Sequence, residues 1–308
     1  MSSKKINYGT KEILIVRFLV TGVTGQLGKD VVKELNKRGY NDVLAYSSAQ
    51  MDITDERKVE SCVFFSEPDV IIHCAAYTAV DKAEDNVQDC NKVNVAGTKF
   101  LIDECKKVGA KFIYVSTDYV FDGTKDLDEC YEVNDKINPI GIYGRTKALG
   151  EYFVREYDKH FIVRTSWVFG ENGNNFVKTM LRLGETHDEV NVVADQYGSP
   201  TYTKDLAKLL VDMSLTDKYG TYHANNEGYC SWAEFAEKIF EVNNMNVKVN
   251  HITTEEYKTR AKRPKNSKLS KKSLIENGFD LLPSYEDALI RYKEELENKN
   301  VKTLKKVR

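Results

Sequence analysis

The 308-residue sequence lacks the features that mark several common classes of protein. Its formal net charge is -2 at pH 7, so no excess of basic residues points to nucleic acid as a partner. No apolar run approaches the roughly 20 residues that a membrane-spanning helix needs. The polar opening MSSKKINYGTKE also lacks the apolar core of a signal peptide. We therefore expect a cytoplasmic protein with neither a membrane nor a nucleic acid as its partner.

Cysteine and histidine are too scattered to indicate a disulfide framework or a metal site. The six cysteines stand singly, without a C-x-x-C pair. A chain of this length can bury a sizeable core and does not depend on disulfides. The five histidines form no H-x-x-x-H pair and no His/Cys cluster. The sequence predicts reduced thiols and no metal.

The first 165 residues alternate short apolar runs with amphipathic helical patterns. Near-continuous apolar runs suit parallel strands that are buried on both faces. The predicted strands are 17–21, 42–47, 69–74, 111–117 and 160–166, and the predicted helices are 26–38, 87–107 and 144–158. In the last of these helices, Leu149, Tyr152 and Phe153 are expected to form a common apolar stripe. This alternation predicts an α/β protein with a Rossmann-type, doubly wound parallel sheet.

After about residue 168 the pattern becomes that of a smaller C-terminal α/β lobe. It predicts a helix over 174–184, a strand over 189–195, a helix over 203–213 opened by a threonine cap, a strand over 219–224, a helix over 231–242 with a Ser/Glu capping box, and a helix over 284–297. We expect an extension (1–16), an NAD(P)-binding domain (17–168), a substrate lobe (169–297) whose segment 203–224 returns to the first sheet, and a basic tail (298–308), solvated or disordered. Residues 13–16 either lengthen the first strand or belong to the extension.

A glycine-rich segment, TGVTGQLGKDVVKEL, joins the first predicted strand to the first helix. Gly22, Gly25 and Gly28 form a G-x-x-G-x-x-G pattern. Glycines here allow a tight turn and let backbone N–H groups approach a diphosphate, while the helix N-terminus adds partial positive charge. The spacing differs from that of ordinary dehydrogenases and of nucleotide triphosphatases. It resembles the loop of the extended short-chain dehydrogenase/reductase superfamily and predicts dinucleotide binding.

The residues after the second strand bear on the choice of cofactor. An acidic residue at this point would bind the 2′-hydroxyl of NAD and repel a 2′-phosphate. Ser47 stands there instead, which favours NADPH and leaves NADH open, since no Arg or Lys lies between Arg38 and Arg57. Asp52 falls where the superfamily often places an aspartate beside the adenine. A cap within a turn is the alternative for this residue.

The stretch YGRTK places Tyr143 one helical turn before Lys147. A chain with 18 tyrosines and many lysines produces such a pair by chance, so its surroundings decide. Thr117 ends a predicted buried strand, and this edge of a parallel sheet is where ligands bind. The Lys147 ammonium would lower the pKa of Tyr143 and hold the nicotinamide ribose, while Thr117 would donate to the substrate oxygen. We expect these three residues to be catalytic.

Several segments resemble those of the dTDP-4-dehydrorhamnose reductases over residues 17–297, notably TGVTGQLG, CAAYTAVDKAE, STDYVFDG, RTSWVFG and ADQYGSPT. The resemblance implies reduction of the C4 ketone of dTDP-4-dehydro-L-rhamnose by NAD(P)H, with Tyr143 as the proton donor. Expected cofactor-binding residues are Gly22, Thr24, Gly25, Gln26, Leu27, Gly28, Ser47, Asp52, Ile53, Cys74, Ala75, Ala76, Tyr143 and Lys147. Expected substrate-binding residues are Tyr77, Val80, Asp118, Tyr119, Trp167, Asn175 and Arg263, the arginine facing the diphosphate.

Other functions remain open on the sequence alone. The helix start lacks the glutamate that some family members are thought to use with magnesium at a dimer contact, so no metal is expected. The sequence leaves a homodimer open as the assembly. A 4,6-dehydratase is disfavoured because Asp118-Tyr119 follows Thr117, where an Asp-Glu pair is typical. The alternatives are a related sugar-nucleotide reductase or epimerase, and a non-catalytic NADP-binding subunit resembling the regulatory subunit of methionine adenosyltransferase.

Overall fold

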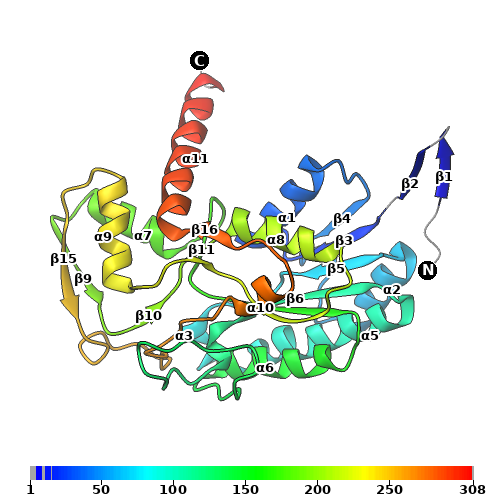
Figure 1. The fold of residues 1–308 in the computed structure, drawn as a ribbon, viewed down its shortest axis with the longest axis horizontal. Coiled ribbons are helices and arrows are strands. Elements are labelled where there is room, and N and C mark those ends of the chain that lie inside the picture. Colours follow the sequence, from blue (N-terminus) through cyan, green and yellow to red (C-terminus); the bar gives the residue numbers. More distant parts are fainter. Residues whose placement is uncertain (1–4, 9–10, 15, 307–308) are drawn as a thin grey trace.

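The computed structural model describes residues 5–8, 11–14 and 16–306. Its centre is a parallel sheet with the strand order β12-β7-β6-β5-β3-β4 (Figure 1). The strands are β3 (Phe18–Thr21), β4 (Val43–Tyr46), β5 (Val70–His73), β6 (Lys111–Thr117), β7 (His160–Thr165) and β12 (Gly220–His223). The predicted fold class, an α/β protein built on a doubly wound parallel sheet, is confirmed.

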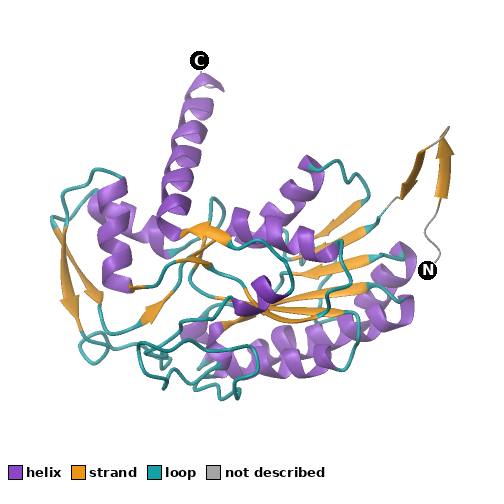
Figure 2. Ribbon diagram, viewed as in Figure 1, coloured by secondary structure: helices purple, strands orange, loops and turns teal. Residues whose placement is uncertain are grey.

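Helices cover both faces of this sheet, as Figure 2 shows. One face carries α1 (Gln26–Lys37) and α8 (Thr203–Ser214), and the other carries α2 (Glu56–Ser66), α5 (Thr98–Val108) and α6 (Ile142–Arg155). Strand β3 serves both, because Phe18 and Val20 pack with α1 and α8 while Leu19 packs with α2 and α5. Both faces are therefore dry, as the apolar runs predicted.

After the first part of the C-terminal lobe, α8 and β12 return to the central sheet. Helix α8 packs on α1, and β12 then pairs in parallel with β7, from Gly220 opposite Phe161 to His223 opposite Arg164. The threonine cap expected for α8 is wrong. Tyr202 is the N-cap residue and makes no side-chain capping bond, while the Thr203 hydroxyl donates to Asp30 on α1 at 2.6 Å. That bond ties the two helices together.

The C-terminal lobe has its own core beside the sheet. Strand β9 (Glu189–Val193) pairs in parallel with β15 (Lys248–Ile252), and α7 (Phe176–Gly184) and α9 (Trp232–Val242) pack against each other and share this core. The predicted capping box is present. The Ser231 side chain accepts a hydrogen bond from the backbone N–H of Glu234, and the Glu234 side chain accepts one from the backbone N–H of Ser231. Helix α11 (Tyr285–Lys306) stands out from the body in Figure 1 and runs past 297, its predicted end.

The shorter elements complete the chain. They are β1 (Lys5–Tyr8), β2 (Lys11–Leu14), α3 (Val80–Ala83), α4 (Val87–Asn91), a π-helical segment (Lys92–Gly97), a 3₁₀ turn (Asp118–Val120), β8 (Val168–Phe169), β10 (Tyr197–Gly198), β11 (Thr201–Tyr202), β13 (Asn226–Glu227), β14 (Cys230–Ser231), α10 (Lys272–Glu276) and β16 (Leu282–Ser284). Strands β1 and β2 form an antiparallel hairpin. Residues 13 and 14 therefore belong to an extension and do not lengthen β3. Among the described residues, no helix is both long and apolar enough to cross a bilayer.

The helix expected over 87–107 is present as one continuous helical run, in which a π-helical segment separates α4 from α5. The apolar stripe predicted for α6 is wrong. In α6 the predicted stripe lies largely on the outside, since Leu149 and Tyr152 are 47% and 58% exposed. The sheet-facing side of α6 holds small and polar residues instead, among them Lys147, Gly150 and Glu151. A periodicity of apolar residues could not reveal this face.

Gly150 sets how closely α6 approaches the sheet. A Cβ atom at this position would lie 2.2 Å from the Tyr114 hydroxyl of β6 and 3.0 Å from the Asn94 carbonyl. We predict that Gly150→Ala pushes α6 outward and lowers the free energy of unfolding by about 1–3 kcal/mol. The exposed neighbour Leu149→Ala should change it by about 0.5 kcal/mol or less. Urea unfolding measures both, and equal losses would contradict the close approach.

Candidate active site

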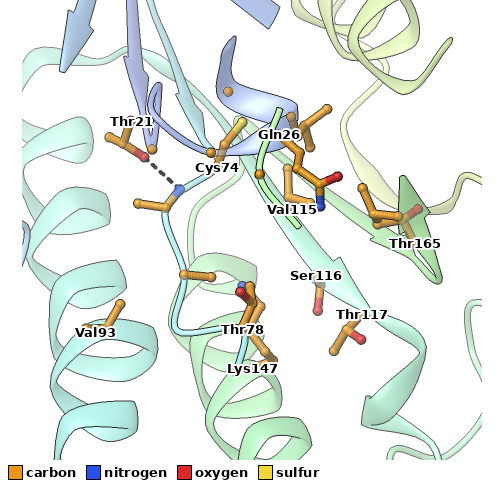
Figure 3. A pocket seen from close by; sticks show the side chains of 18 of the residues that line it. Thr21, Gln26, Cys74, Thr78, Val93, Val115, Ser116, Thr117, Lys147 and Thr165 are labelled. Atoms are coloured by element: carbon orange, nitrogen blue, oxygen red, sulfur yellow. Dashed lines mark hydrogen bonds between the residues drawn. The ribbon is translucent and has the colours of Figure 1, made fainter. Parts of the chain in front are cut away.

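A cleft of about 690 Å³ opens at the carboxyl ends of the strands, between the sheet and the lobe. Figure 3 shows Lys147 on its helix and Ser116 and Thr117 at the end of their strand. Of the residues predicted from the sequence, the cleft is lined by Gly22, Thr24, Gly25, Gln26, Leu27, Gly28, Asp52, Ile53, Cys74, Ala75, Ala76, Val80, Thr117, Asp118, Tyr119, Tyr143, Lys147 and Trp167. Residues from six segments far apart in the sequence therefore meet in one place.

The glycine loop is shaped for a close backbone approach. Gly22 has φ +69°, and a Cβ there would lie 2.6 Å from the Ala75 nitrogen. A Cβ at Gly28 would lie 2.4 Å from the Gly22 carbonyl oxygen, so α1 packs directly on the turn. The N-cap of α1, Gly25, offers no side chain, and the first turn carries no acidic residue. The N–H groups at this end are left for an anionic group, which fits a dinucleotide diphosphate.

At the far end of the cleft, the two neighbouring serines have different surroundings. Tyr46 and Ser48 line the cleft, whereas Ser47 is not among the lining residues. The Ser47 hydroxyl donates to Gln50 Oε1 at 2.8 Å, and its backbone N–H donates to the same oxygen. Ser47 directly follows β4, and Ser48 begins the turn over residues 48–50. Asp52 both lines the cleft and caps a turn, since its Oδ1 accepts from the backbone and hydroxyl of Thr54.

The proposed catalytic residues meet where β6 ends and α6 begins. Thr117 is the last residue of β6, and its hydroxyl donates to Asp118 Oδ1 at 3.0 Å while it accepts from the backbone N–H of Tyr119. The rings of Tyr143 and Tyr119 meet edge to face at 5.6 Å. Thr117 also lies close enough to Tyr143 to lower the pKa of that phenol by hydrogen bonding. A carboxyl group, a hydroxyl group and a phenol therefore lie close together at this point.

The predicted lowering of the Tyr143 pKa is wrong. Burial raises the pKa of Tyr143 above its ordinary value, opposed by the bond from Thr117, and the carboxylate of Asp118 adds to the rise. Lys147 is only 2% exposed, and burial lowers its pKa to about 7, with Glu151 opposing the change. Its Nζ lies 3.9 Å from the centre of the Tyr114 ring. For Lys147, desolvation at this depth outweighs the favourable effect of the Glu151 charge.

Asp118 is the buried acid of the cleft. It is 2% exposed, and burial raises its pKa to about 6, with hydrogen bonds from its neighbours opposing the rise. Its Oδ2 has no hydrogen-bond partner within the part of the chain that the structure describes. A buried acceptor without a partner is costly, so this oxygen is suited to a donor from a bound ligand.

Three further predicted residues do not line the cleft. The backbone N–H of Tyr77 donates to Asn94 Oδ1 at 2.8 Å. Asn175 caps α7 and donates to Gln26 Oε1 at 2.9 Å, which links the lobe to the glycine loop. Arg263 donates to the Tyr119 hydroxyl at 3.1 Å and to Asp81 Oδ2 at 2.6 Å. These residues lie behind the cleft wall rather than on it.

Trp167 forms the lobe side of the cleft. Its ring stacks on Trp232 with centroids 3.6 Å apart, and a Cβ at Gly198 would lie 2.8 Å from the indole. The backbone of Trp167 has φ +49°, a conformation that bulky residues rarely adopt. Such strain is kept only where the surroundings impose it, and here the stacked ring holds Trp167 at the wall of the cleft.

Sequence reasoning missed several lining and supporting residues. The further lining residues are Thr21, Tyr46, Ser48, Met51, Thr54, Thr78, Val93, Val115, Ser116, Thr165, Ser166, Val168, Gly173 and Asn174. Asn94, in the π-helical segment, bonds both backbone groups of Tyr77 and donates to Thr146 on α6. It therefore positions the cleft wall and α6 together. The only available signal was a polar residue within an amphipathic helical pattern.

The buried Lys147 gives a prediction for stability without ligand. Its pKa is about 7 in the folded chain against an ordinary value of 10.5. Below pH 7 the folded and the unfolded chain both carry the proton on Lys147, so the full cost of burying the charge lowers the stability. Between pH 7 and 10.5 only the unfolded chain carries this proton, so the stability of the folded chain rises with pH. We predict that Lys147→Met is more stable than the parent at pH 6, and that the gain shrinks by roughly 1–2 kcal/mol per pH unit above pH 7. Urea unfolding at pH 6 and pH 9 tests this, and equal gains would contradict it.

Comparisons with known proteins agree with this geometry. The family described as RmlD substrate binding domain matches residues 16–298. The chain is 43% identical over 284 residues to a dTDP-4-dehydrorhamnose reductase of Aggregatibacter actinomycetemcomitans, covering 88% of this chain and 95% of that protein. It is 40% identical over 266 residues to the spore coat polysaccharide biosynthesis protein SpsK of Bacillus subtilis, covering 86% and 93%.

A solved structure extends the likeness to three dimensions. The dTDP-4-dehydrorhamnose reductase of Bacillus anthracis, in complex with NADP, superposes with a TM-score of 0.88 at 46% identity, covering 91% of this chain and 99% of that one. The family match spans most of the chain, and each of these relatives is at least 40% identical to it. The chain belongs to the RmlD substrate binding domain family, together with the dTDP-4-dehydrorhamnose reductases that it resembles.

Proposed function

We propose that this protein uses NADPH to reduce the C4 ketone of dTDP-4-dehydro-L-rhamnose to dTDP-L-rhamnose. The observation that carries the proposal is the meeting of Thr117, Tyr143 and Lys147 in the cleft that begins at the glycine loop. Its relatives are named for this reduction, and one of them was solved with NADP. The dinucleotide would lie along the loop from Gly22 to Gly28, with its diphosphate at the N-terminus of α1.

NADPH, when bound, supplies the hydride; the chain supplies the proton and the binding. Because burial raises the pKa of Tyr143, its phenol keeps its proton across the neutral range. Tyr143 then donates this proton to the C4 oxygen as negative charge develops there. Thr117 is the second partner for that oxygen, which requires its hydroxyl to turn from Asp118 toward the substrate. An epimerase would not need the net delivery of a proton.

Lys147 has two proposed tasks in this scheme. Its ammonium group binds the nicotinamide ribose hydroxyls, and its positive charge favours the tyrosinate that Tyr143 leaves behind. A pKa of about 7 leaves the group partly protonated near neutrality in the chain without ligand. Reprotonation of Tyr143 from solvent then completes the cycle.

The remaining predicted residues are assigned to the sugar nucleotide. Asp118 and Tyr119 would contact the hexose, with the unpartnered Asp118 Oδ2 as an acceptor for a sugar hydroxyl. Trp167 would provide an apolar surface for the hexose ring. Arg263 reaches the site only through Tyr119, so contact with the diphosphate requires it to exchange Asp81 for the substrate.

The proton donor is tested by removing one hydroxyl. We predict that Tyr143→Phe lowers kcat for NADPH oxidation with dTDP-4-dehydro-L-rhamnose by about 10²–10⁴-fold and leaves NADPH affinity nearly unchanged. Tyr152→Phe, on the exposed side of the same helix, should keep the parent rate. Stopped-flow absorbance of the reduced nicotinamide gives both rates. A Tyr143→Phe rate equal to the parent rate would end this mechanism.

Cofactor preference is tested at the two neighbouring serines. A carboxylate that faces the cleft repels the 2′-phosphate of NADPH and accepts from the 2′-hydroxyl of NADH. We predict that Ser48→Asp raises KM for NADPH by at least tenfold with little change for NADH, whereas Ser47→Asp has a smaller effect because Ser47 does not line the cleft. If Ser47→Asp instead raised KM for NADPH more than Ser48→Asp did, the adenosine ribose would lie next to Ser47.

A further inference from the structure

A fully buried ion pair lies behind the proposed catalytic residues. Glu151 on α6 and Arg164 on β7 are both completely inaccessible to solvent. Two parallel bonds join them, from Arg164 Nε to Glu151 Oε1 at 2.9 Å and from Arg164 Nη2 to Oε2 at 2.8 Å. Arg164 also donates to the Val133 carbonyl at 3.1 Å and lies over the Phe121 ring. The pair is therefore fixed on all sides.

The carboxylate has four donors. Besides the two bonds from Arg164, Ser116 donates to Oε1 at 2.6 Å and Arg155 donates to Oε2 at 2.9 Å. Burial by itself raises the pKa of Glu151, but these bonds and the Arg164 charge hold it below its ordinary value. Glu151 thus stays ionised where an unsupported carboxylate would take up a proton.

Glu151 connects both halves of the proposed catalytic site. It follows Tyr143 and Lys147 at steps of four residues, so the three share one face of α6. Through Ser116 it holds β6 at the residue before Thr117, and through Arg164 it holds β7, since Ser116 and Arg164 are paired in the sheet. One carboxylate thereby joins α6 to the two strands on which it rests.

The other groups that face Lys147 do not supply a lasting negative charge. They are His73 on β5, Cys74 after it, Cys90 on α4 and Tyr114 on β6, with Tyr143 one helical turn earlier on α6. Burial keeps His73 neutral, because its pKa falls to about 3, and burial raises the pKa of Cys74 to about 12. Burial also raises the pKa of Cys90, Tyr114 and Tyr143. Of this set and Glu151, only Glu151 is ionised at neutral pH.

We propose that Glu151 is a positioning residue that keeps Lys147 charged and holds α6 against the strand end that carries Thr117. The proposal rests on the function proposed above. It differs from a merely structural role, because an ion pair that only joined α6 to the sheet would leave the charge of Lys147 unaffected. Arg164 acts one step further back, by keeping Glu151 ionised and oriented.

The test is the pH dependence of turnover in Glu151→Gln, which keeps the shape and removes the charge. Loss of a neighbouring carboxylate shifts the titration of an ammonium group by one unit or more toward acid. We expect the descending limb of kcat to move to lower pH, so that the variant loses about fivefold more activity at pH 8 than at pH 6. Arg155→Gln is the matched control. Arg155 is a 41% exposed partner of Glu151, and its replacement leaves the carboxylate in place. Its profile should match that of the parent.

A folded Glu151→Gln with an unshifted profile would overturn the proposal. If Glu151→Gln does not fold, because it leaves Arg164 buried without a counter-ion, the double variant Glu151→Met/Arg164→Met removes both charges together. The pH dependence of Lys147 acetylation by acetic anhydride, read by mass spectrometry without ligand, then gives the same quantity. An acid shift of one unit or more supports the proposal, and no shift overturns it. Since this readout needs no turnover, it also separates failure of this proposal from failure of the proposed reduction.

Discussion

Six parallel strands form one sheet only when both faces are covered, and this requirement governs the rest of the molecule. Each parallel connection must cross from one end of the sheet to the other, so helices α1, α8, α2, α5 and α6 fill the two faces. All the carboxyl ends then meet at a single edge, where the glycine loop and the strand end at Thr117 line one cleft. The lobe closes this edge, and Asn175 bonds directly to Gln26 in the glycine loop.

Helix α6 departs from the usual rule that a helix buries an apolar stripe. Its inner face carries Lys147 and Glu151, and its outer face exposes Leu149 and Tyr152. Buried charge is costly unless it is paired and hydrogen-bonded, and Glu151 meets both conditions through Arg164 and Ser116. Lys147 is only partly compensated, as its lowered pKa indicates. Stability is thus given up at a position where the proposed mechanism uses a cation, a common pattern at active sites.

The sequence predicted those features whose signal is local. Strand runs, the capping box at Ser231 and the glycine loop depend on neighbouring residues, and four-residue spacing alone puts Tyr143 and Lys147 on one face. The failures arise where distant segments meet. No local pattern pairs Glu151 with Arg164, and the burial that raises the pKa of Tyr143 comes from elements far along the chain. The choice between Ser47 and its neighbour depended on a single step in a loop, which propensity does not resolve.

The most direct test of the account follows a deuterium atom from cofactor to product. The protein would be supplied with dTDP-4-dehydro-L-rhamnose and NADPH deuterated at the transferable position of the nicotinamide, and the sugar examined by NMR. The account predicts dTDP-L-rhamnose with one deuterium at C4 for each NADPH oxidised. An unchanged sugar, with the cofactor bound in the cleft, would show a binding subunit instead of a reductase, and deuterium at another carbon would contradict the proposed position of the ketone beside Tyr143.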